Sequence, residues 1–297
     1  MNVPGPSPRT ATSPVSGPSP QVLHEQATVL GAVREDIRQT LRVGWLDPAI
    51  EAAAQNPAFF TAAWSAVRPN VGKSFLSLAR VLRTEAVESV RTWFDTPPVL
   101  KGLQDELAEE EVRRIEESAK AGYLAAPKVQ VVVHAMYRAA RRDRIAGTGR
   151  EEPPIRRGVP EWQRWMSFHP SPDDARGVLE QSAEAFGTPA PPTPLRLFAR
   201  WPAALDTLWG SLGRLPGTRP WNETTVRLRR VVLAGIATLP HPVELQWTAL
   251  KARGFSDDDR VLLQDVLAVW DASMAAQTLA AAAVWVLLGA PDVGVES

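Results

Sequence analysis

The sequence contains no cysteine and only four histidines among its 297 residues. Without cysteine the chain can form no disulfide, carries no thiolate nucleophile and offers no cysteine-ligated metal or iron–sulfur site. We therefore expect neither a metal nor another cofactor. We interpret His134, which lies beside an apolar helical stripe, as a hydrogen-bonded core or boundary histidine. The spacing of the histidines in the sequence does not resemble that of paired metal ligands: His24, His134, His169 and His241.

An excess of charge of one sign is also lacking, because 33 basic residues balance 33 acidic ones. No overall field therefore recruits nucleic acid or an anionic membrane, and we expect neither as a partner. Residues 1–20 are rich in proline, serine and glycine, which predicts a disordered tail. This segment has neither the basic start nor the apolar run of a secretory signal, so we expect a cytoplasmic location.

One uncharged stretch, Ala272 to Ala290, has the length of a membrane span. Alanine is only weakly apolar, however, and Ser273, Gln277 and Thr278 interrupt the stretch. We therefore interpret it as a helix buried in the protein core.

A segment of nine residues occurs twice in degraded form, as NPAFFTAAW at 56–64 and as WPAALDTLW at 201–209. In each copy a proline begins the pattern, and an apolar residue three positions later shares a helical face with a tryptophan seven positions later. The separation of roughly 145 residues is far longer than the repeats of a solenoid. It predicts two copies packed about an approximate two-fold axis, with a cleft along their seam.

Helical periodicity recurs along the chain without a convincing strand, so the predicted fold class is all-α. We expect a first helical repeat at 21–137, a linker rich in glycine and proline at 138–159, and a second repeat at 160–297. In the first repeat, helices are expected over 23–41, 57–67, 74–93 and 99–122, and from Pro127. In the second repeat, they are expected from Pro202, Thr224, Pro242, Ser256 and about Ala275.

The tripeptide Gly72-Lys73-Ser74 has the ending of a phosphate-binding loop. Val67 stands where that motif needs its first glycine, without which the backbone cannot wrap around a phosphate. Nucleotide binding is therefore not expected.

The segment Leu195 to Pro202, LRLFARWP, resembles the aromatic-Arg-x-Leu-Ala-x-Trp-Pro element of the DehI-type 2-haloacid dehalogenases, or halocarboxylic acid dehydrogenase DehI. The duplicated proline–tryptophan units and the helical pattern extend the resemblance from about Leu30 to Ala290. It implies an all-α pseudo-dimer with the active site between the repeats. It also implies that an aspartate, helped by an asparagine, activates a water that displaces the halide directly and inverts the carbon.

Two positions of this chain depart from the family's pattern. Pro194 stands where the resemblance places the aspartate, and Ala126 stands where it places the asparagine. Loss of a general base costs on the order of a hundred- to ten-thousand-fold in rate. We therefore expect weak or altered hydrolysis of short 2-haloalkanoic acids. The alternative is a non-catalytic protein that binds a small carboxylic acid or acts as a scaffold on the same fold.

Asp47 is a candidate substitute base, because it lies beside Trp45 in the corresponding loop of the first copy. The alternative for Asp47 is an ordinary loop or cap aspartate before Pro48. Asp271, next to Trp270, is a second conceivable replacement, and the sequence leaves a homodimer open. The residues expected around the substrate are Trp45, Ile50, Ala126, Thr193, Pro194, Leu195 and Trp270.

Overall fold

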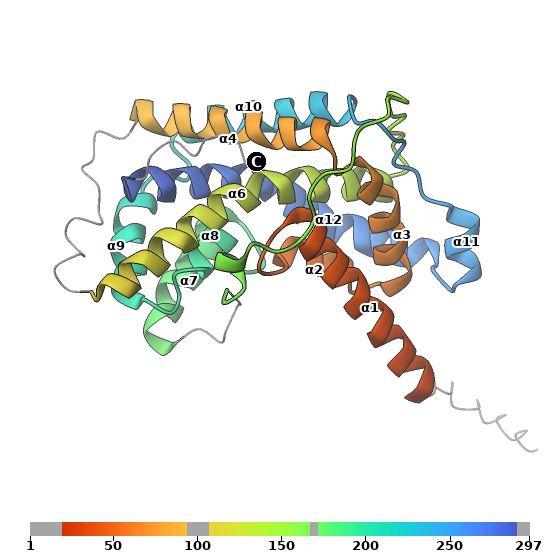
Figure 1. Cartoon of the computed structure of the whole chain (residues 1–297), viewed down its shortest axis with the longest axis horizontal. Helices are drawn as coiled ribbons and strands as arrows, with labels where there is room; N and C mark the ends of the chain where they lie inside the picture. The colour runs from red at the N-terminus through yellow and green to blue at the C-terminus, as the bar shows by residue number, and fades with distance from the viewer. Residues whose placement is uncertain (1–19, 94–106, 167–171, 290–297) are drawn as a thin grey trace, which may run out of the picture.

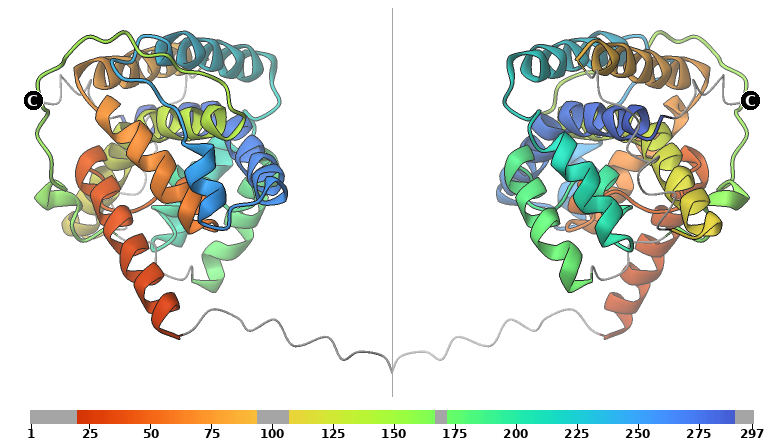
Figure 2. Two further views of the ribbon diagram at one scale, coloured as in Figure 1. Left: turned by 90° about the vertical axis from the view of Figure 1, so that its right-hand side faces the viewer. Right: turned by 90° about the vertical axis from the view of Figure 1, so that its left-hand side faces the viewer.

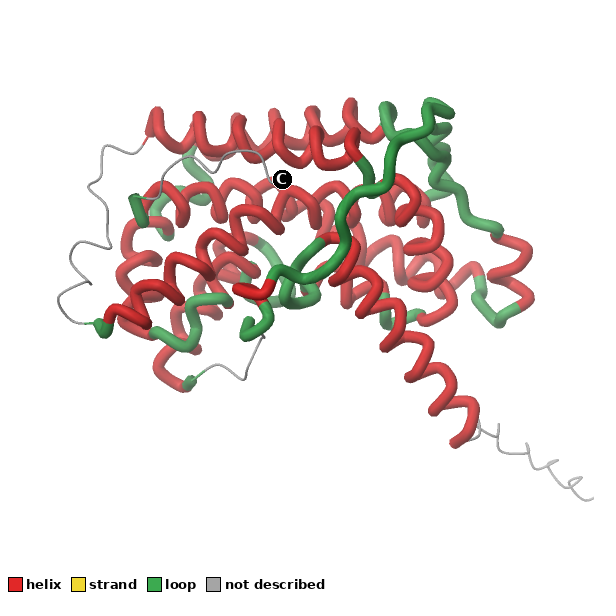
Figure 3. Tube along the Cα trace, viewed as in Figure 1, coloured by secondary structure: helices red, strands yellow, loops and turns green. Residues whose placement is uncertain are grey.

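The computed structural model describes residues 20–93, 107–166 and 172–289. Within these ranges every regular element is a helix (Figure 3). Ile145 and Val243 form an isolated antiparallel β-bridge, which is not part of a strand. The predicted all-α fold class is confirmed. The expected tail lies outside the described residues except for Pro20, and so does the start of the helix expected over 99–122.

Among the described residues, five α-helices precede the connecting segment, and several begin and end where the sequence predicts. Proline at the first helical position of α3 matches the predicted start, and the predicted end at Val67 is also observed. The helices are α1 (Pro20–Leu41), α2 (Pro48–Ala53), α3 (Pro57–Val67), α4 (Lys73–Trp93) and α6 (Glu109–Ala140).

Six helices follow the connecting segment in the described part of the chain. The helix predicted from Pro202 begins there, and the helix predicted from Thr224 begins one turn earlier, at Arg219. The helices are α7 (Asp173–Phe186), α8 (Thr193–Arg196), α9 (Pro202–Leu212), α10 (Arg219–Ile236), α11 (Trp247–Ala252) and α12 (Asp257–Leu287).

The helices form three layers (Figures 1 and 2). Helices α4 and α10 lie side by side over the two longest helices, α6 and α12, which form the middle layer. Beneath this pair, α1, α2, α3 and α11 gather toward one end, and α7, α8 and α9 gather toward the other (Figure 1). The short helices α2 and α8 each contact both α6 and α12, so both lie against the central pair of helices.

Helices α6 and α12 are antiparallel and supply much of the core. The Tyr123 and Trp285 rings stack with centroids 5.2 Å apart, near one end of the contact. At its middle, the Thr278 hydroxyl donates a hydrogen bond of 2.8 Å to Oε1 of the buried Gln130. By its length and mean hydropathy α12 could cross a membrane, but 72% of its most apolar window is buried. The predicted core helix is confirmed.

Three predicted helix starts are wrong. Pro127 lies inside α6 rather than beginning a helix, because burial of the surrounding turns on both sides outweighs the hydrogen bond that proline removes. No new helix begins near Ala275, which lies inside α12. The segment after Pro242 is extended, because the Val243 N–H donates to the Ile145 carbonyl at 2.9 Å, and the helix begins at Trp247.

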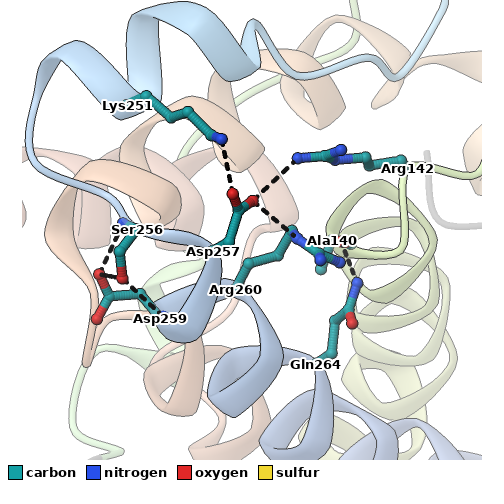
Figure 4. A network of polar contacts seen from close by, with 8 residues as sticks. All are labelled: Ala140, Arg142, Lys251, Ser256, Asp257, Asp259, Arg260 and Gln264. Carbon is teal, nitrogen blue, oxygen red and sulfur yellow. Dashed lines mark hydrogen bonds and ion pairs between the residues drawn. The ribbon is translucent and has the colours of Figure 1, made fainter.

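The start of α12 is held by a network of charged side chains (Figure 4). Ser256 caps the helix, as predicted, by accepting a hydrogen bond from the Asp259 N–H at 3.0 Å. The Asp257 carboxylate accepts from Lys251 of α11 at 2.7 Å and from Arg142, just after α6, at 3.3 Å. The cap therefore also joins α12 to the ends of α6 and α11.

The start of α4 explains the sequence that resembles a phosphate-binding loop. Glu152, from the connecting segment, accepts hydrogen bonds from the Ser74 N–H at 3.1 and 3.0 Å and also from the Ser74 hydroxyl. A Cβ on Gly72 would come within 2.5 Å of the Glu152 carboxylate. The N–H groups of this turn therefore bind a carboxylate of the chain itself, and Gly72 allows its close approach.

Glu152→Gln is expected to lower the free energy of unfolding by about 1 kcal/mol, because it weakens this helix cap. Burial raises the pKa of Glu152, but the hydrogen bonds from Ser74 outweigh it and leave the pKa below its ordinary value. The stabilisation is therefore present above the ordinary pKa and is lost as the pH falls through the lowered one. Urea unfolding at pH 7 and pH 3 measures it, and an equal loss for the exposed Glu151→Gln would contradict it.

Candidate active site

Asp47 links the two parts of the chain at the point where α2 and α8 begin. One carboxylate oxygen accepts a hydrogen bond of 2.9 Å from the Ala49 N–H, which makes Asp47 the N-cap of α2. The other oxygen accepts a hydrogen bond of 2.5 Å from the hydroxyl of Thr193, the first residue of α8. Asp47 is therefore a helix cap, as one interpretation of the sequence expects, and also a contact between distant segments.

The environment of Asp47 favours its protonated form. Its side chain is buried, and this burial raises the pKa of the carboxyl group. The hydrogen bonds from Thr193 and Ala49 and the positive charge of Arg196 oppose that rise without cancelling it. Burial in turn lowers the pKa of the Arg196 guanidinium. A carboxylate with a raised pKa holds a proton more strongly, which suits a general base.

The loop before Asp47 is pressed against the segment around Gln163. The Gly44 N–H donates a hydrogen bond of 3.0 Å to Oε1 of Gln163. A Cβ on Gly44 would lie 2.4 Å from the Gln163 carbonyl oxygen, so only glycine fits. The buried amine of Lys128 donates to the Leu41 carbonyl at 3.2 Å and so holds the end of α1 just before this loop. Both contacts fix the position of Asp47.

Two cavities flank α2. The first, which we term the arginine cavity, has a volume of about 520 Å³. The second, the apolar cavity, has a volume of about 550 Å³. The arginine cavity is lined by Arg38, Gly44, Trp45, Leu46, Pro48, Glu51, Arg164, Met166 and Arg196. The apolar cavity is lined by Pro48, Glu51, Ala52, Gln55, Pro189, Asp265, Val266, Val269 and Trp270.

The arginine cavity has a net positive lining. Glu51 is its single acidic residue and is paired with Arg34, which lies outside the lining, at 2.6 Å. Arg38 is paired with Glu35 at 2.9 Å. Arg164 and Arg196 are the other two cationic residues of the lining, and Arg196 also interacts electrostatically with Asp47. Guanidinium groups suit the binding of a carboxylate.

The structure separates the residues that the sequence places around one cleft. Trp45 lines the arginine cavity, whereas Trp270 lines the apolar cavity. Ile50 and Leu195 are 1% and 0% exposed and belong to the hydrophobic core. Of the expected lining residues, Thr193 donates a hydrogen bond to Asp47.

The two positions that depart from the family's pattern lie along α6 and α8. A Cβ on Gly122 of α6 would lie 3.8 Å from the Pro194 Cα and 3.4 Å from a methyl group of Leu197, so α8 packs closely on α6 there. Ala126 follows one turn later on α6. Neither Pro194 nor Ala126 brings an ionisable group to this contact.

Sequence reasoning missed the cationic residues of the site. Arg196 lies within the segment from Leu195 to Pro202 that carries the resemblance, and the need of a carboxylate for a cation could have identified it. Arg164 and Met166 lie in a short irregular segment after Gln163 that gives no periodic signal. Only the folded chain brings them to Trp45.

Asp271, the second conceivable base, is directed toward α6. Its carboxylate lies 2.6 Å from Nδ1 of His134, and both side chains are buried. The prediction of a hydrogen-bonded core histidine is confirmed. Asp271 is not part of the lining of either cavity that flanks α2. In the described part of the chain, no group of three or more histidine, aspartate or glutamate side chains could hold a metal ion.

Comparison with known proteins places this architecture among dehalogenases. No family model matches the sequence. A configuration-inverting 2-haloacid dehalogenase from Pseudomonas sp. (strain 113) is 26% identical over 224 residues, which cover 71% of this chain and 72% of that protein. The structure of a D-2-haloacid dehalogenase with L-LA has a TM-score of 0.77 at 17% identity, and that of a mutant with D-2-CPA has a TM-score of 0.75. Both alignments cover 95% of this chain and 99% of the other.

The fold is that of the all-α 2-haloacid dehalogenases. The sequence is similar to that of a configuration-inverting 2-haloacid dehalogenase, so the predicted resemblance is confirmed.

Proposed function

We propose that this protein hydrolyses 2-haloalkanoic acids through a water activated directly by Asp47. The observation that carries the proposal is the buried Asp47 carboxylate, bonded to Thr193 at the start of α8 and next to the arginine cavity. Its chain neighbours Leu46 and Pro48 both line that cavity. The relationship to configuration-inverting dehalogenases supports the same chemistry.

In the proposed reaction, Arg164 and Arg196 bind the substrate carboxylate. Asp47 accepts a proton from a water whose oxygen attacks the halogen-bearing carbon from the side opposite the halogen. As the carbon–oxygen bond forms, the carbon–halogen bond breaks, and the halide leaves with the bonding electron pair. The carbon inverts, no ester forms, and Asp47 returns its proton to solvent. Trp45 and Met166 shield the reacting centre from bulk water.

The expected activity is weak or altered. Asp47 already accepts a hydrogen bond at each carboxylate oxygen, so a water must share those acceptors. Pro194 and Ala126 supply no second polar group to hold that water. This lack favours the alternative function, in which the same cationic cavity binds a small carboxylic acid without turnover.

Incubation with each enantiomer of 2-chloropropionate separates the two functions. Chloride release accompanied by 2-hydroxypropionate of inverted configuration is the expected result. Binding of 2-chloropropionate without chloride release would favour the non-catalytic binding function over the enzymatic one. Failure to bind either enantiomer would contradict both functions.

We also infer that the chain is an internal repeat with pseudo-two-fold symmetry. Helices α3 and α9 each have 11 residues and begin at prolines about 145 positions apart. Arg42, after α1, and Gly187, after α7, share a left-handed backbone with φ of 59° and 62°. The bonded pairs Asp47–Thr193 and Gln130–Thr278 have nearly the same spacing, as expected for residues beside a two-fold axis. The homodimer and the cytoplasmic location stay predictions.

Thr193→Val is expected to move the acidic limb of the pH–rate profile to higher pH. The Thr193 hydroxyl lowers the pKa of Asp47, so its loss lets burial raise that pKa further. The dependence of kcat/KM on pH measures this shift. Thr188→Val is the control, because the Thr188 hydroxyl bonds only to the backbone carbonyls of Ala183 and Ala190 among the described residues. An unchanged limb in Thr193→Val would show that Asp47 is not the titrating base.

A further inference from the structure

The arginine cavity and the apolar cavity share lining residues in the first turn of α2. Pro48 and Glu51 line both of them. Glu51 does not place an uncompensated negative charge at this junction, because it accepts hydrogen bonds of 2.9, 3.0 and 2.6 Å from Arg34. A ligand that crosses the first turn of α2 therefore passes from a cationic end to an apolar end.

The apolar end is suited to a hydrocarbon chain. Its wall includes Trp270 and two valines of α12, Val266 and Val269, with Gln55 and Asp265 as further polar lining residues. The Val269 side chain is 43% exposed, although it lies beside a cavity, so apolar surface remains for a ligand to cover. Apolar lining with a few polar groups at one end is typical of sites for small organic molecules.

The size of the cavities also exceeds what a three-carbon acid requires. Each one alone falls within the range of roughly 300–1,000 Å³ found for drug-sized ligands. A short 2-haloacid bound by Arg164 and Arg196 would leave the side toward Trp270 unfilled. The geometry therefore favours a longer molecule with its charge at one end.

We propose that this site takes carboxylic acids with an extended apolar chain. The carboxylate lies at Arg164 and Arg196, and the chain runs across Pro48 to Val269 and Trp270. This inference rests on the proposed function for the carboxylate position. It adds a second subsite and names the substrate class as medium-chain acids rather than three-carbon ones.

Calorimetric titration of the full-length protein with propionate, hexanoate and octanoate tests the inference without turnover. Burial of a methylene group contributes about 0.8 kcal/mol, so each added methylene is expected to tighten binding by up to about fourfold. Octanoate has five more methylene groups than propionate, so it should bind more tightly by up to about a thousandfold. Equal affinities for the three acids would overturn the apolar subsite and leave the carboxylate site standing. Failure of all three to bind would contradict the proposed function as well.

A matched pair of variants tests where the hydrocarbon chain of the bound acid lies. Val269→Asp should reduce the ratio of octanoate to propionate affinity to near one, because it replaces apolar wall by a second carboxylate beside Asp265 in the apolar cavity. Val261→Asp is the control, since Val261 lies on the same helix, is 47% exposed and is not part of the lining of either cavity. An equal decrease of this affinity ratio in both variants would mean that the hydrocarbon chain binds outside the apolar cavity. If Val269→Asp does not fold, the titrations of the wild-type protein with propionate, hexanoate and octanoate still test the proposal.

Discussion

Asp47→Asn is expected to reduce chloride release from 2-haloacids by about a hundred- to ten-thousand-fold, because an amide cannot accept the proton that the attacking water must lose. The substitution changes little else. Asparagine caps helices as well as aspartate does, so the hydrogen bond to the Ala49 N–H can remain. The Thr193 hydroxyl can rotate to donate to, or accept from, the new amide. The measurement is kcat for chloride release, with binding of 2-chloropropionate followed in parallel.

The stability of Asp47→Asn provides the internal control for this result. Burial raises the pKa of Asp47 above its ordinary value, so its contribution to stability is full below that value and is lost as the pH rises through the raised pKa. At neutral pH the ionised carboxylate therefore costs folding free energy that an amide avoids. Asp47→Asn should be at least as stable as the wild type in urea at pH 7.

The exposed Asp206 of α9 gives the matched substitution, and Asp206→Asn should change neither activity nor stability. Full activity in Asp47→Asn would place the base elsewhere. Loss of the folded state in Asp47→Asn would instead assign Asp47 a purely structural role. Inactivity in a stable protein that still binds its acid is the combination that supports the mechanism.

The sequence predicts helix boundaries correctly where the local signals are strong. Helices α3 and α9 were predicted to the residue at their starts, because proline favours the first turn and the apolar positions that follow keep a helical period. The same reasoning, that proline begins a helix, wrongly predicts a helix start at Pro127. There the surrounding turns are buried on both sides, and tertiary packing holds the helix together across the missing hydrogen bond.

Some residues of the proposed site follow from the repeat that the sequence predicts, and the others do not. The repeat placed Asp47 and Thr193 in corresponding loops, and the structure brings these residues, 146 positions apart, into a hydrogen bond. Nothing in the sequence placed Arg164 beside Trp45, because the segment that carries Arg164 is irregular and lacks a counterpart in the repeat pattern. Trp45 and Trp270 were expected around one cleft, and only the position of α2 between them shows that they line separate cavities.

Asp271→Ala is expected to cause the largest loss of stability among the variants considered, about 3 kcal/mol in the free energy of unfolding. The side chains of Asp271 and His134 are 4% and 7% exposed. If one of them is removed, water cannot take its place without opening the contact between α6 and α12. Nε2 of His134 has no hydrogen-bond partner among the described residues. Loss of Asp271 would therefore leave both ring nitrogens of a buried histidine unsatisfied.

Urea unfolding of Asp271→Ala, His134→Ala and the double variant measures the coupling between the two side chains. The double variant should lose less stability than the sum of the single variants, because the second substitution removes a group that the first has already left unpaired. Asp265→Ala is the control, since Asp265 lies on the same helix but is exposed, and it should change stability by less than about 0.5 kcal/mol. Additive losses would mean that the short contact between His134 and Asp271 contributes nothing beyond packing. A coupling of 1 kcal/mol or more would instead identify this pair as a polar contact that helps to fix α12 against α6, and hence helps to hold Trp270 in the wall of the apolar cavity.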